Sequence, residues 1–153
     1  MQNNYASNSH CKYYLKVHLI FVTKYRKNLL VNGLDTWLKS KFEYISNGCD
    51  FSIDIMETDK NHIHLLVSYP PSISVSSIVR KLKQKSTVDI WKHFHTIMRL
   101  EFWKENTFWS DGYFACSIGE ASPETIRKYI ENQGYFQFIP ETKDFGVFLK
   151  KNI

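Results

Sequence analysis

The chain has 153 residues, of which 43% are hydrophobic and 16% aromatic, which is enough apolar surface for one folded domain and excludes a disordered polymer. Lys and Arg outnumber Asp and Glu by 20 to 15, so the net charge of +5 permits a polyanionic partner without requiring one. The odd, scattered cysteines (Cys11, Cys49 and Cys116), the polar start and the lack of a long apolar run predict an intracellular soluble protein without disulfides, thiolate zinc or membrane spans.

The first half of the chain reads as strand, helix, strand. Residues 13–23 are rich in aromatic and β-branched side chains that alternate, which predicts a strand, and the basic residues 24–27 follow as a loop. Apolar residues then recur with helical spacing from Leu34 until Asn47-Gly48 ends the helix. Residues 51–58 alternate again and predict a second strand. The expected core face of the first strand carries Leu15, Val17, Leu19 and Phe21.

The second half adds a strand, a long helix, another strand and a last helix. A turn at 59–61 leads into a strand over 61–67 that stops at Pro70-Pro71. A longer helix is predicted for 74–94, and a strand or hairpin for 108–118 around Asp111-Gly112. The last helix opens at Ser122 and Pro123 and closes near Gly134.

This order predicts an α+β fold of ferredoxin or RNA-recognition type. An antiparallel sheet with the order β-α-β-β-α-β is expected, followed by an additional C-terminal helix. We expect a single domain over residues 1–153, with a polar N-terminal tail of about residues 1–10 and a C-terminal tail after about residue 135.

Two histidines in the strand 61–67 are the first candidate functional residues. Alternate side chains on a strand share a face, so His62 and His64 stand side by side while Ile63, Leu65 and Val67 point into a core. Two neutral imidazoles can bind a divalent cation if at least one more ligand joins them. The competing interpretation is a pair of polar residues on a solvated sheet face. Apolar neighbours, the tight turn and the nearby Asp59 favour the metal site.

The last helix carries the second candidate set. Ile126, Tyr129, Ile130 and Gln133 fall on one helical face, which could simply be a core stripe. Gln133 fits a core poorly, because a buried amide needs partners. Tyr129 and Gln133 are i, i+4 neighbours on the helix. A metal ion bound by Gln133 would therefore lie close to the Tyr129 hydroxyl, which could act as a nucleophile. A tyrosine hydroxyl is a weak nucleophile, so it requires an electrophile activated by a metal, such as a phosphodiester.

Basic and aromatic residues occur together in two places and suggest contact with nucleic acid. One group follows the first strand, and the other lies on the helix 74–94. A solvated basic face is the ordinary explanation, and Trp91 and Phe94 fit a core as well as they fit stacking on unpaired bases. The candidate DNA-binding residues are Lys24, Tyr25, Arg26, Lys27, Arg80 and Lys83.

Four short motifs in order resemble the single-tyrosine transposases of the His-hydrophobic-His class, the TnpA-like enzymes of insertion sequences that move as single-stranded DNA. The first is Val22-Thr23-Lys24-Tyr25-Arg26-Lys27, which looks like the family's first-strand exit. Residues 59–67 resemble its metal-binding strand, and Phe108 to Phe114 resemble its W-S-x-x-Y/F segment. Residues 129–133 match its catalytic-helix motif. The resemblance covers nearly the whole chain but gives no role to residues 96–105.

The resemblance implies a set of roles for these residues. Tyr129 would attack the DNA to form a 5′-phosphotyrosine, and His62, His64 and Gln133 would bind Mg or Mn, with Asp59 joining or supporting the site. It also implies a homodimer whose active sites combine residues of both subunits. The DNA partner would be single-stranded and carry hairpins, and the protein would be cytoplasmic, prokaryotic and DNA-associated, without a nucleotide cofactor.

The function expected from the sequence is therefore cleavage and rejoining of single-stranded DNA at hairpin-bearing element ends. Three alternatives stay open. One is a domesticated relative that processes chromosomal repeat hairpins. Another is a non-catalytic hairpin-binding protein on the same fold, and a third is a hydrolytic phosphoesterase with a metal-activated water.

Overall fold

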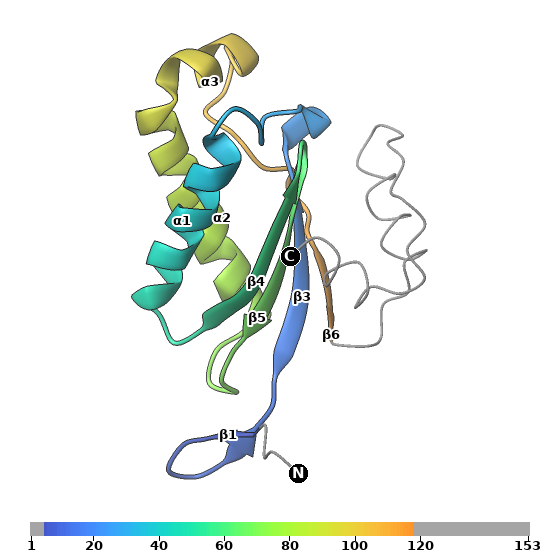
Figure 1. Cartoon of the computed structure of the whole chain (residues 1–153), viewed down its shortest axis with the longest axis vertical. Coiled ribbons are helices and arrows are strands. Elements are labelled where there is room, and N and C mark those ends of the chain that lie inside the picture. Colours follow the sequence, from blue (N-terminus) through green and yellow to red (C-terminus); the bar gives the residue numbers. More distant parts are fainter. Residues whose placement is uncertain (1–4, 118–153) are drawn as a thin grey trace.

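A four-stranded antiparallel sheet with helices packed on one face forms the body of the molecule (Figure 1), and the computed structural model describes residues 5–117. The strand order across the sheet is β4-β5-β3-β6. The strands are β3 (Lys16–Val22), β4 (Ser52–Asp59), β5 (His62–Ser68) and β6 (Phe114–Ser117), and the helices are α1 (Leu34–Asn47), α2 (Val75–His93) and α3 (His95–Glu101).

This architecture confirms the predicted α+β class and the β-α-β-β-α-β order of the main elements. The first and third main strands, β3 and β5, are central, and β4 and β6 are the edges. The helix predicted over 122–134 lies outside the described residues. Within residues 5–117, no helix has both the length and the apolar character needed to cross a membrane.

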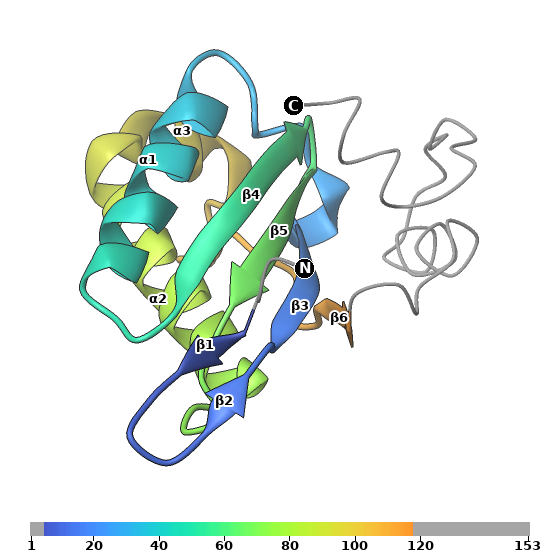
Figure 2. The same ribbon diagram turned by 60° about the horizontal axis from the view of Figure 1, so that its bottom comes forward.

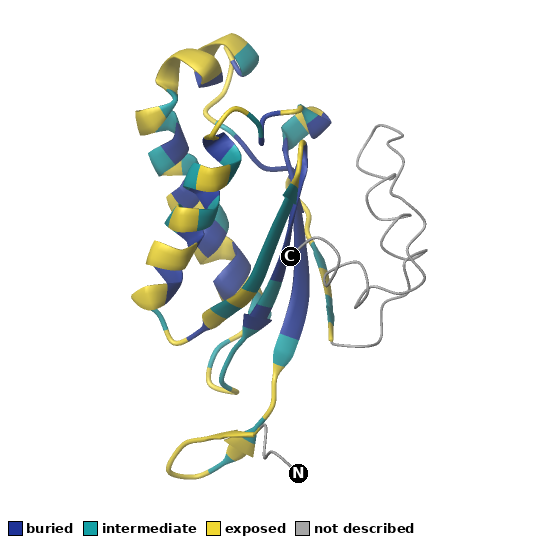
Figure 3. Cartoon of the chain, in the orientation of Figure 1, coloured by how far each residue is buried: buried dark blue, intermediate teal, exposed yellow. Residues whose placement is uncertain are grey.

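The core lies between the sheet and the helical layer (Figure 3). Alternate residues of the two central strands point into it, and α1 and α2 contribute apolar residues at helical spacing. The Phe21 and Phe42 rings meet edge to face with centroids 6.1 Å apart. The fully buried side chains of this core include Leu19, Phe21, Leu38, Phe42, Ile63, Leu65, Ile78 and Leu82.

The N-terminal part of the first predicted strand belongs to a separate hairpin. Strand β2 (Lys12–Tyr13) pairs with β1 (Ala6–Ser7), and β3 starts only at Lys16. Leu15 was expected on the core face but is 37% exposed, because the chain passes there between the hairpin and the sheet. Figure 2 shows this hairpin projecting beyond the end of the sheet.

Helix α3 was not predicted. Helix α2 ends where Phe94 leaves helical geometry (φ −119°, ψ 35°), and α3 starts at the next residue. Only Met98 of α3 is buried, so α3 lacks the periodic apolar stripe by which the longer helices were found.

The expected loop after β3 is a tight turn, η1 (Lys24–Arg26), and not an irregular connection. Tyr25 (φ 58°) and Arg26 (φ 51°) both adopt left-handed backbone angles, which are uncommon for residues with a Cβ. Segment 108–110 fastens the end of β3, since Ser110 N donates to Val22 O at 2.8 Å and Lys24 N donates to Phe108 O at 2.8 Å. The turn is thereby held at one end of the sheet, beside the start of β5.

Candidate metal centre and nucleic-acid interface

The two histidines of β5 lie side by side on the sheet face opposite to α1 and α2, since Ile63, Leu65 and Val67 face the core on the helix side. Their ring centroids are 5.0 Å apart, with the ring planes inclined by 73°. Both are buried, with exposed fractions of 5% for His62 and 2% for His64. The predicted shared face is confirmed, whereas the competing picture of a solvated polar pair is not supported by this burial.

Both imidazoles are held neutral. Burial lowers the pKa of His62 to about 4, an effect that the nearby Arg26 guanidinium reinforces and the Asp59 carboxylate opposes. Burial also puts the pKa of His64 well below its usual value, with further lowering by His62 and His18. A neutral imidazole keeps the ring-nitrogen lone pair that a metal ion requires, so the pair is in the form that binds divalent cations.

The orientation of His62 is fixed by its neighbour. Nδ1 of His62 lies 2.7 Å from the Asn61 Oδ1 atom, which can only accept a hydrogen bond, so Nδ1 donates and Nε2 keeps its lone pair. Asn61 is itself held at the end of β3, because its carbonyl oxygen accepts from the Thr23 backbone N at 2.9 Å. This arrangement is the one expected for a histidine that binds a metal through Nε2.

Acidic residues of β4 flank the histidine pair. The strand register places Asp59 opposite His62 and Glu57 opposite His64, on the same face. Asp59 is exposed, and its carboxylate accepts a hydrogen bond from the Lys60 backbone N at 2.7 Å. Glu57 was missed at the sequence level. The predicted three-residue turn at 59–61 pairs it with Ile63, whereas the actual turn has two residues, 60–61, and pairs it with His64.

The described part of the chain supplies an incomplete ligand set. Within residues 5–117, no three His, Cys, Asp or Glu side chains cluster in a way that could hold a metal ion. The buried, neutral imidazole pair fits two positions of a divalent-metal site, and a further donor is required. The predicted third ligand Gln133 and the predicted nucleophile Tyr129 lie outside the described residues.

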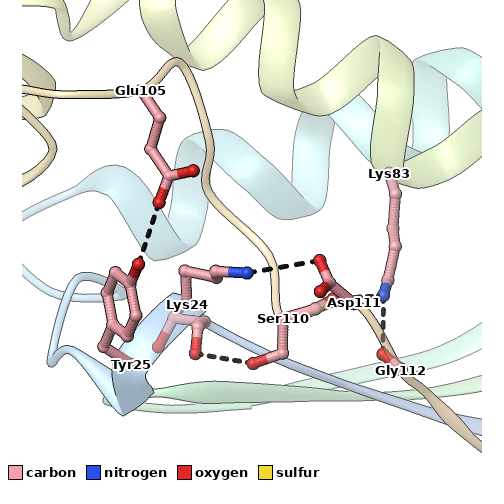
Figure 4. Close-up of polar contacts among 8 residues, drawn as sticks. Lys24, Tyr25, Lys83, Glu105, Ser110, Asp111 and Gly112 are labelled. Carbon is pink, nitrogen blue, oxygen red and sulfur yellow. Dashed lines mark hydrogen bonds and ion pairs between the residues drawn. The ribbon is translucent and has the colours of Figure 1, made fainter.

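Two side chains of the turn η1 and that of the next residue, Lys27, are each paired with an acidic residue of segment 101–111; Figure 4 shows two of these pairs. The pairs are Lys24 Nζ with Asp111 (3.3 Å), Tyr25 Oη with Glu105 (2.9 Å) and Lys27 Nζ with Glu101 (2.9 Å). The Asp111 side chain is 95% exposed, and a pair so accessible to water contributes little stability. An external anion can therefore take the place of this carboxylate at small cost.

The other predicted DNA-binding residues fall into three environments. Arg26 is buried, and its charge is close enough to lower the pKa of His62, so it is not part of an outer surface. Lys83 is half-buried, and its ammonium donates to the carbonyl oxygens of Ser110 (2.8 Å) and Gly112 (2.7 Å) (Figure 4). Burial lowers the pKa of Lys83 to about 8. Arg80 is exposed one helical turn away.

A groove of about 840 Å³ brings several of these residues together between α2 and segment 106–113. Arg80 and Lys83 line it from α2, and Asp111 and Tyr113 line it from the segment. Because Asp111 also pairs with Lys24, the groove adjoins the turn η1. Turn and groove therefore form one connected candidate surface for a nucleic-acid backbone.

The Trp109-Ser110 motif has a structural role. Trp109 packs in the core with ring centroids 5.7 Å from Phe21 and 6.2 Å from Phe42, and its Nε1 donates to Ser86 Oγ at 3.0 Å. Ser110 Oγ donates to Thr23 O at 3.1 Å. The motif thus ties helix α2 and the end of β3 together, which positions the turn η1.

We expect the metal-free protein to lose stability as the pH falls from about 6.5 to about 4. Burial lowers the pKa of His18 to about 4, as it does for His62, so the unfolded chain binds protons in this window that the folded chain excludes. Above the ordinary histidine pKa these imidazoles are neutral in both the folded and the unfolded chain, so they cause no loss of stability there. Below it, each such imidazole lowers the free energy of unfolding by about 1.4 kcal/mol per pH unit.

Urea unfolding with EDTA between pH 7.5 and 4.5 measures this slope. The His18→Gln variant has one imidazole less and is expected to show a shallower decline than the unaltered chain. Equal slopes would mean that His18 is protonated in the folded state.

Comparison with known proteins identifies the family to which the chain belongs. The family model described as "Transposase IS200 like" matches residues 11–133. The chain belongs to this family of IS200-like transposases, which are enzymes that cleave DNA and transfer its strands.

The chain is similar along most of its length to named transposases. It is 29% identical over 126 residues to the transposase for insertion sequence element IS200 of Salmonella typhimurium, covering 82% of this chain and 80% of the relative. It is 30% identical over 121 residues to the ISDra2 transposase TnpA of Deinococcus radiodurans, covering 79% of this chain and 85% of the relative.

Solved structures agree on the fold. A crystal structure from Deinococcus radiodurans R1, described as a transposase, has a TM-score of 0.78 and 25% identity, and covers 86% of this chain and 99% of that one. A REP-associated tyrosine transposase bound to a REP hairpin has a TM-score of 0.50 and 15% identity, and covers 82% and 69% of the two chains. The second likeness concerns the fold alone.

Proposed function

We propose that this transposase cuts and rejoins single-stranded DNA at hairpin-bearing element ends through a covalent 5′-phosphotyrosine at Tyr129, with the help of Mg or Mn. The observation that carries the proposal is the pair of buried, neutral imidazoles of His62 and His64, side by side on one strand face. Membership of the IS200-like family supports it.

In this proposal His62 and His64 bind the metal, Gln133 completes the ligand set, and Asp59 supports it from across the strand pair. The metal, when bound, would polarise the scissile phosphate and orient it for in-line attack. Asn61 holds the His62 ring by Nδ1, so Nε2 is the nitrogen that would bind the ion. Arg26, buried beside His62, supplies a fixed positive charge for the same phosphate.

The covalent step exchanges one phosphodiester for another. The Tyr129 oxygen forms a bond to phosphorus, the bond from phosphorus to the 3′ oxygen breaks, and the phenolic proton is transferred to the departing 3′ oxygen. The 5′ phosphate stays attached to the protein. Attack by a 3′ hydroxyl then reverses the step, rejoins DNA and restores the phenol, so no nucleotide triphosphate is consumed.

We further propose that the functional unit is a homodimer of one-domain chains whose active sites draw residues from both subunits. The described residues supply two imidazoles and no third donor of the carboxylate, thiolate or imidazole type, which is consistent with a site completed by another segment or subunit. The hairpin named for the REP-associated transposase supports structured single-stranded DNA as the substrate class.

The test is a search for the covalent intermediate. A labelled single-stranded hairpin oligonucleotide from the element end is incubated with the protein and Mn, and a protein-DNA adduct is expected on a denaturing gel. Proteolysis and mass spectrometry should place the nucleotide on Tyr129, and EDTA should prevent the adduct. Cleaved DNA with no attached protein would instead favour hydrolysis by a metal-activated water.

Removing two cations, Lys24 and Arg80, from the candidate surface is expected to weaken DNA binding without regard to sequence. The Lys24→Ala/Arg80→Ala double variant loses two phosphate contacts, so the slope of log affinity against log salt should fall by about 0.7 per contact for a single strand. Arg26 and Lys83 are left intact, because both are engaged inside the structure.

A double variant of equal charge serves as the control. Lys39 and Lys85 lie on α1 and α2 outside the groove, and their replacement by Ala should leave the salt slope nearly unchanged. Equal slopes for the two double variants would show that net charge, and not this surface, governs binding. Binding is measured by fluorescence anisotropy between 50 and 300 mM salt, about a sixfold range chosen to resolve such slopes.

A further inference from the structure

Helix α3 and the residues that follow it carry large apolar side chains that the fold leaves in water. Leu100 is 78% exposed, Trp103 is 77% exposed and Ile97 is 48% exposed. Single exposed apolar residues are ordinary on protein surfaces, but three within seven residues are a local concentration, here called the apolar patch. Packing within the described residues does not account for it, since Met98 is the one α3 residue in the core.

A hollow of about 420 Å³ lies beside this patch, within the range of roughly 300–1,000 Å³ that is common for small-ligand sites. Trp91 and Trp103 contribute aromatic walls, and Lys92 and Arg99 contribute positive charge. None of the residues that line the hollow is acidic. Lys104 adds a further cation, with its Nζ atom 4.6 Å from the centre of the Trp103 ring.

The acidic residues of the same segment are engaged elsewhere. Glu101 pairs with Lys27, and Glu105 accepts from the Tyr25 hydroxyl, so both carboxylates are committed to the turn η1. The charges of this segment are therefore separated, with acids toward η1 and bases around Trp103. A surface of this kind attracts an anion that also carries a flat apolar group.

We propose that this surface, the α3 surface (Trp91, Lys92, Arg99 and Trp103), binds an unpaired nucleotide of the single-stranded DNA substrate, with its base stacked on Trp103. This inference adds a second DNA contact and rests on the proposed function for the nature of the polymer. Base stacking on an exposed aromatic ring, with cations following the backbone, is how proteins hold single strands irrespective of sequence. Paired bases are already stacked on their neighbours and cannot offer their faces in this way.

The place of the α3 surface in the fold agrees with this role. Helix α3 lies at the same end of the molecule as η1 and the turn between β4 and β5 (Figure 1), and the Lys27–Glu101 pair joins it to η1. Turn η1 follows β3, whose Val22 pairs with His62. A strand held by Trp103 can therefore continue over η1 toward the histidine pair.

The test is binding of a fluorescein-labelled fifteen-nucleotide poly-dT strand to the full chain, measured by anisotropy with EDTA present. Loss of one stacked base is expected to weaken binding of the Trp103→Ala variant about tenfold, while Trp103→Phe keeps most of the affinity. Tyr44→Ala is the matched control, because Tyr44 is 73% exposed on α1, far along the chain from α3, and should leave the affinity unchanged.

Two further measurements separate stacking from other roles. Binding of a blunt duplex of equal length should be unaffected by Trp103→Ala, and poly-dT should quench tryptophan fluorescence less in Trp103→Phe than in the unaltered chain. Unchanged poly-dT affinity of Trp103→Ala would overturn the proposal. So would a change in oligomeric state by light scattering without a change in affinity, which would assign the patch to protein contact.

Failure here is distinguishable from failure of the proposed function. The adduct at Tyr129 depends on the nucleophile and the metal, and it should form with Trp103→Ala at saturating DNA. An intact adduct with unaltered poly-dT affinity would refute the α3 surface alone. The opposite outcome is also possible: Trp103→Ala shows the expected loss of poly-dT affinity, but the unaltered chain forms no adduct. That result would refute the proposed phosphotyrosine chemistry and leave the single-strand contact at Trp103 supported.

Discussion

Replacing Tyr129 by Phe is expected to abolish the covalent protein-DNA adduct and to reduce strand cleavage by more than about a thousandfold, the scale on which loss of an enzyme's nucleophile acts. The substitution removes one oxygen atom and keeps the ring. DNA binding should therefore persist, since the proposed phosphate contacts at Lys24 and Arg80 and the metal ligands are untouched. The assay is the denaturing gel with the labelled hairpin strand and Mn.

Two results would contradict this expectation. An adduct that survives in Tyr129→Phe would mean that another residue attacks the phosphate. Cleavage that continues without an adduct would indicate that water is the nucleophile. Tyr44→Phe is the matched control, since it removes the same atom from an exposed tyrosine on α1, and it should retain full activity.

Replacing His64 by Ala is expected to remove metal-dependent cleavage and to weaken Mn binding by more than the roughly 10–100-fold that loss of an outer-sphere partner costs. His64 has no substitute in the described strand, because its neighbours Ile63 and Leu65 point into the core. The large-to-small change also leaves a hole, which lowers stability by about 1–3 kcal/mol. Loss of activity alone would therefore be ambiguous.

The control for His64→Ala is His18→Ala. Both residues are buried histidines with side chains on the same sheet face, but His18 is outside the proposed ligand set. A ligand that binds only the folded state raises the melting temperature, so Mn should stabilise the unaltered chain and His18→Ala but not His64→Ala. Stabilisation of all three proteins by Mn to the same extent would remove His64 from the metal site.

The sequence was sufficient for features set by a short periodicity. The face that His62 and His64 share follows from the two-residue repeat of a strand, and the limits of α1 and α2 follow from apolar spacing and from Gly48 and Ser74 at their ends. The pairing of Glu57 with His64 depended on strand register, and the predicted turn at 59–61 is one residue longer than the actual turn at 60–61, which shifts that register by one.

Other features depend on contacts between distant residues, which no local pattern encodes. Lys83 has the spacing of an outward-facing residue, yet the backbone of segment 110–112 draws its ammonium inward. Arg26 lies in a basic run typical of an exposed loop, yet its left-handed backbone angle accompanies a buried side chain. Helix α3 was missed because it buries so little that its apolar residues show no helical stripe.

The carboxylates that accompany the turn η1 have a consequence for how DNA arrives. Lys24, Tyr25 and Lys27 already contact Asp111, Glu105 and Glu101. If DNA binds here as proposed, an incoming phosphate would replace one of these carboxylates and would not have to order a mobile side chain. The entropic cost of ordering the turn is thus met during folding. A single anion would gain little from such an exchange, whereas a polymer that replaces several carboxylates at once would gain at each of them. We therefore expect the turn to favour linked charges over isolated ones.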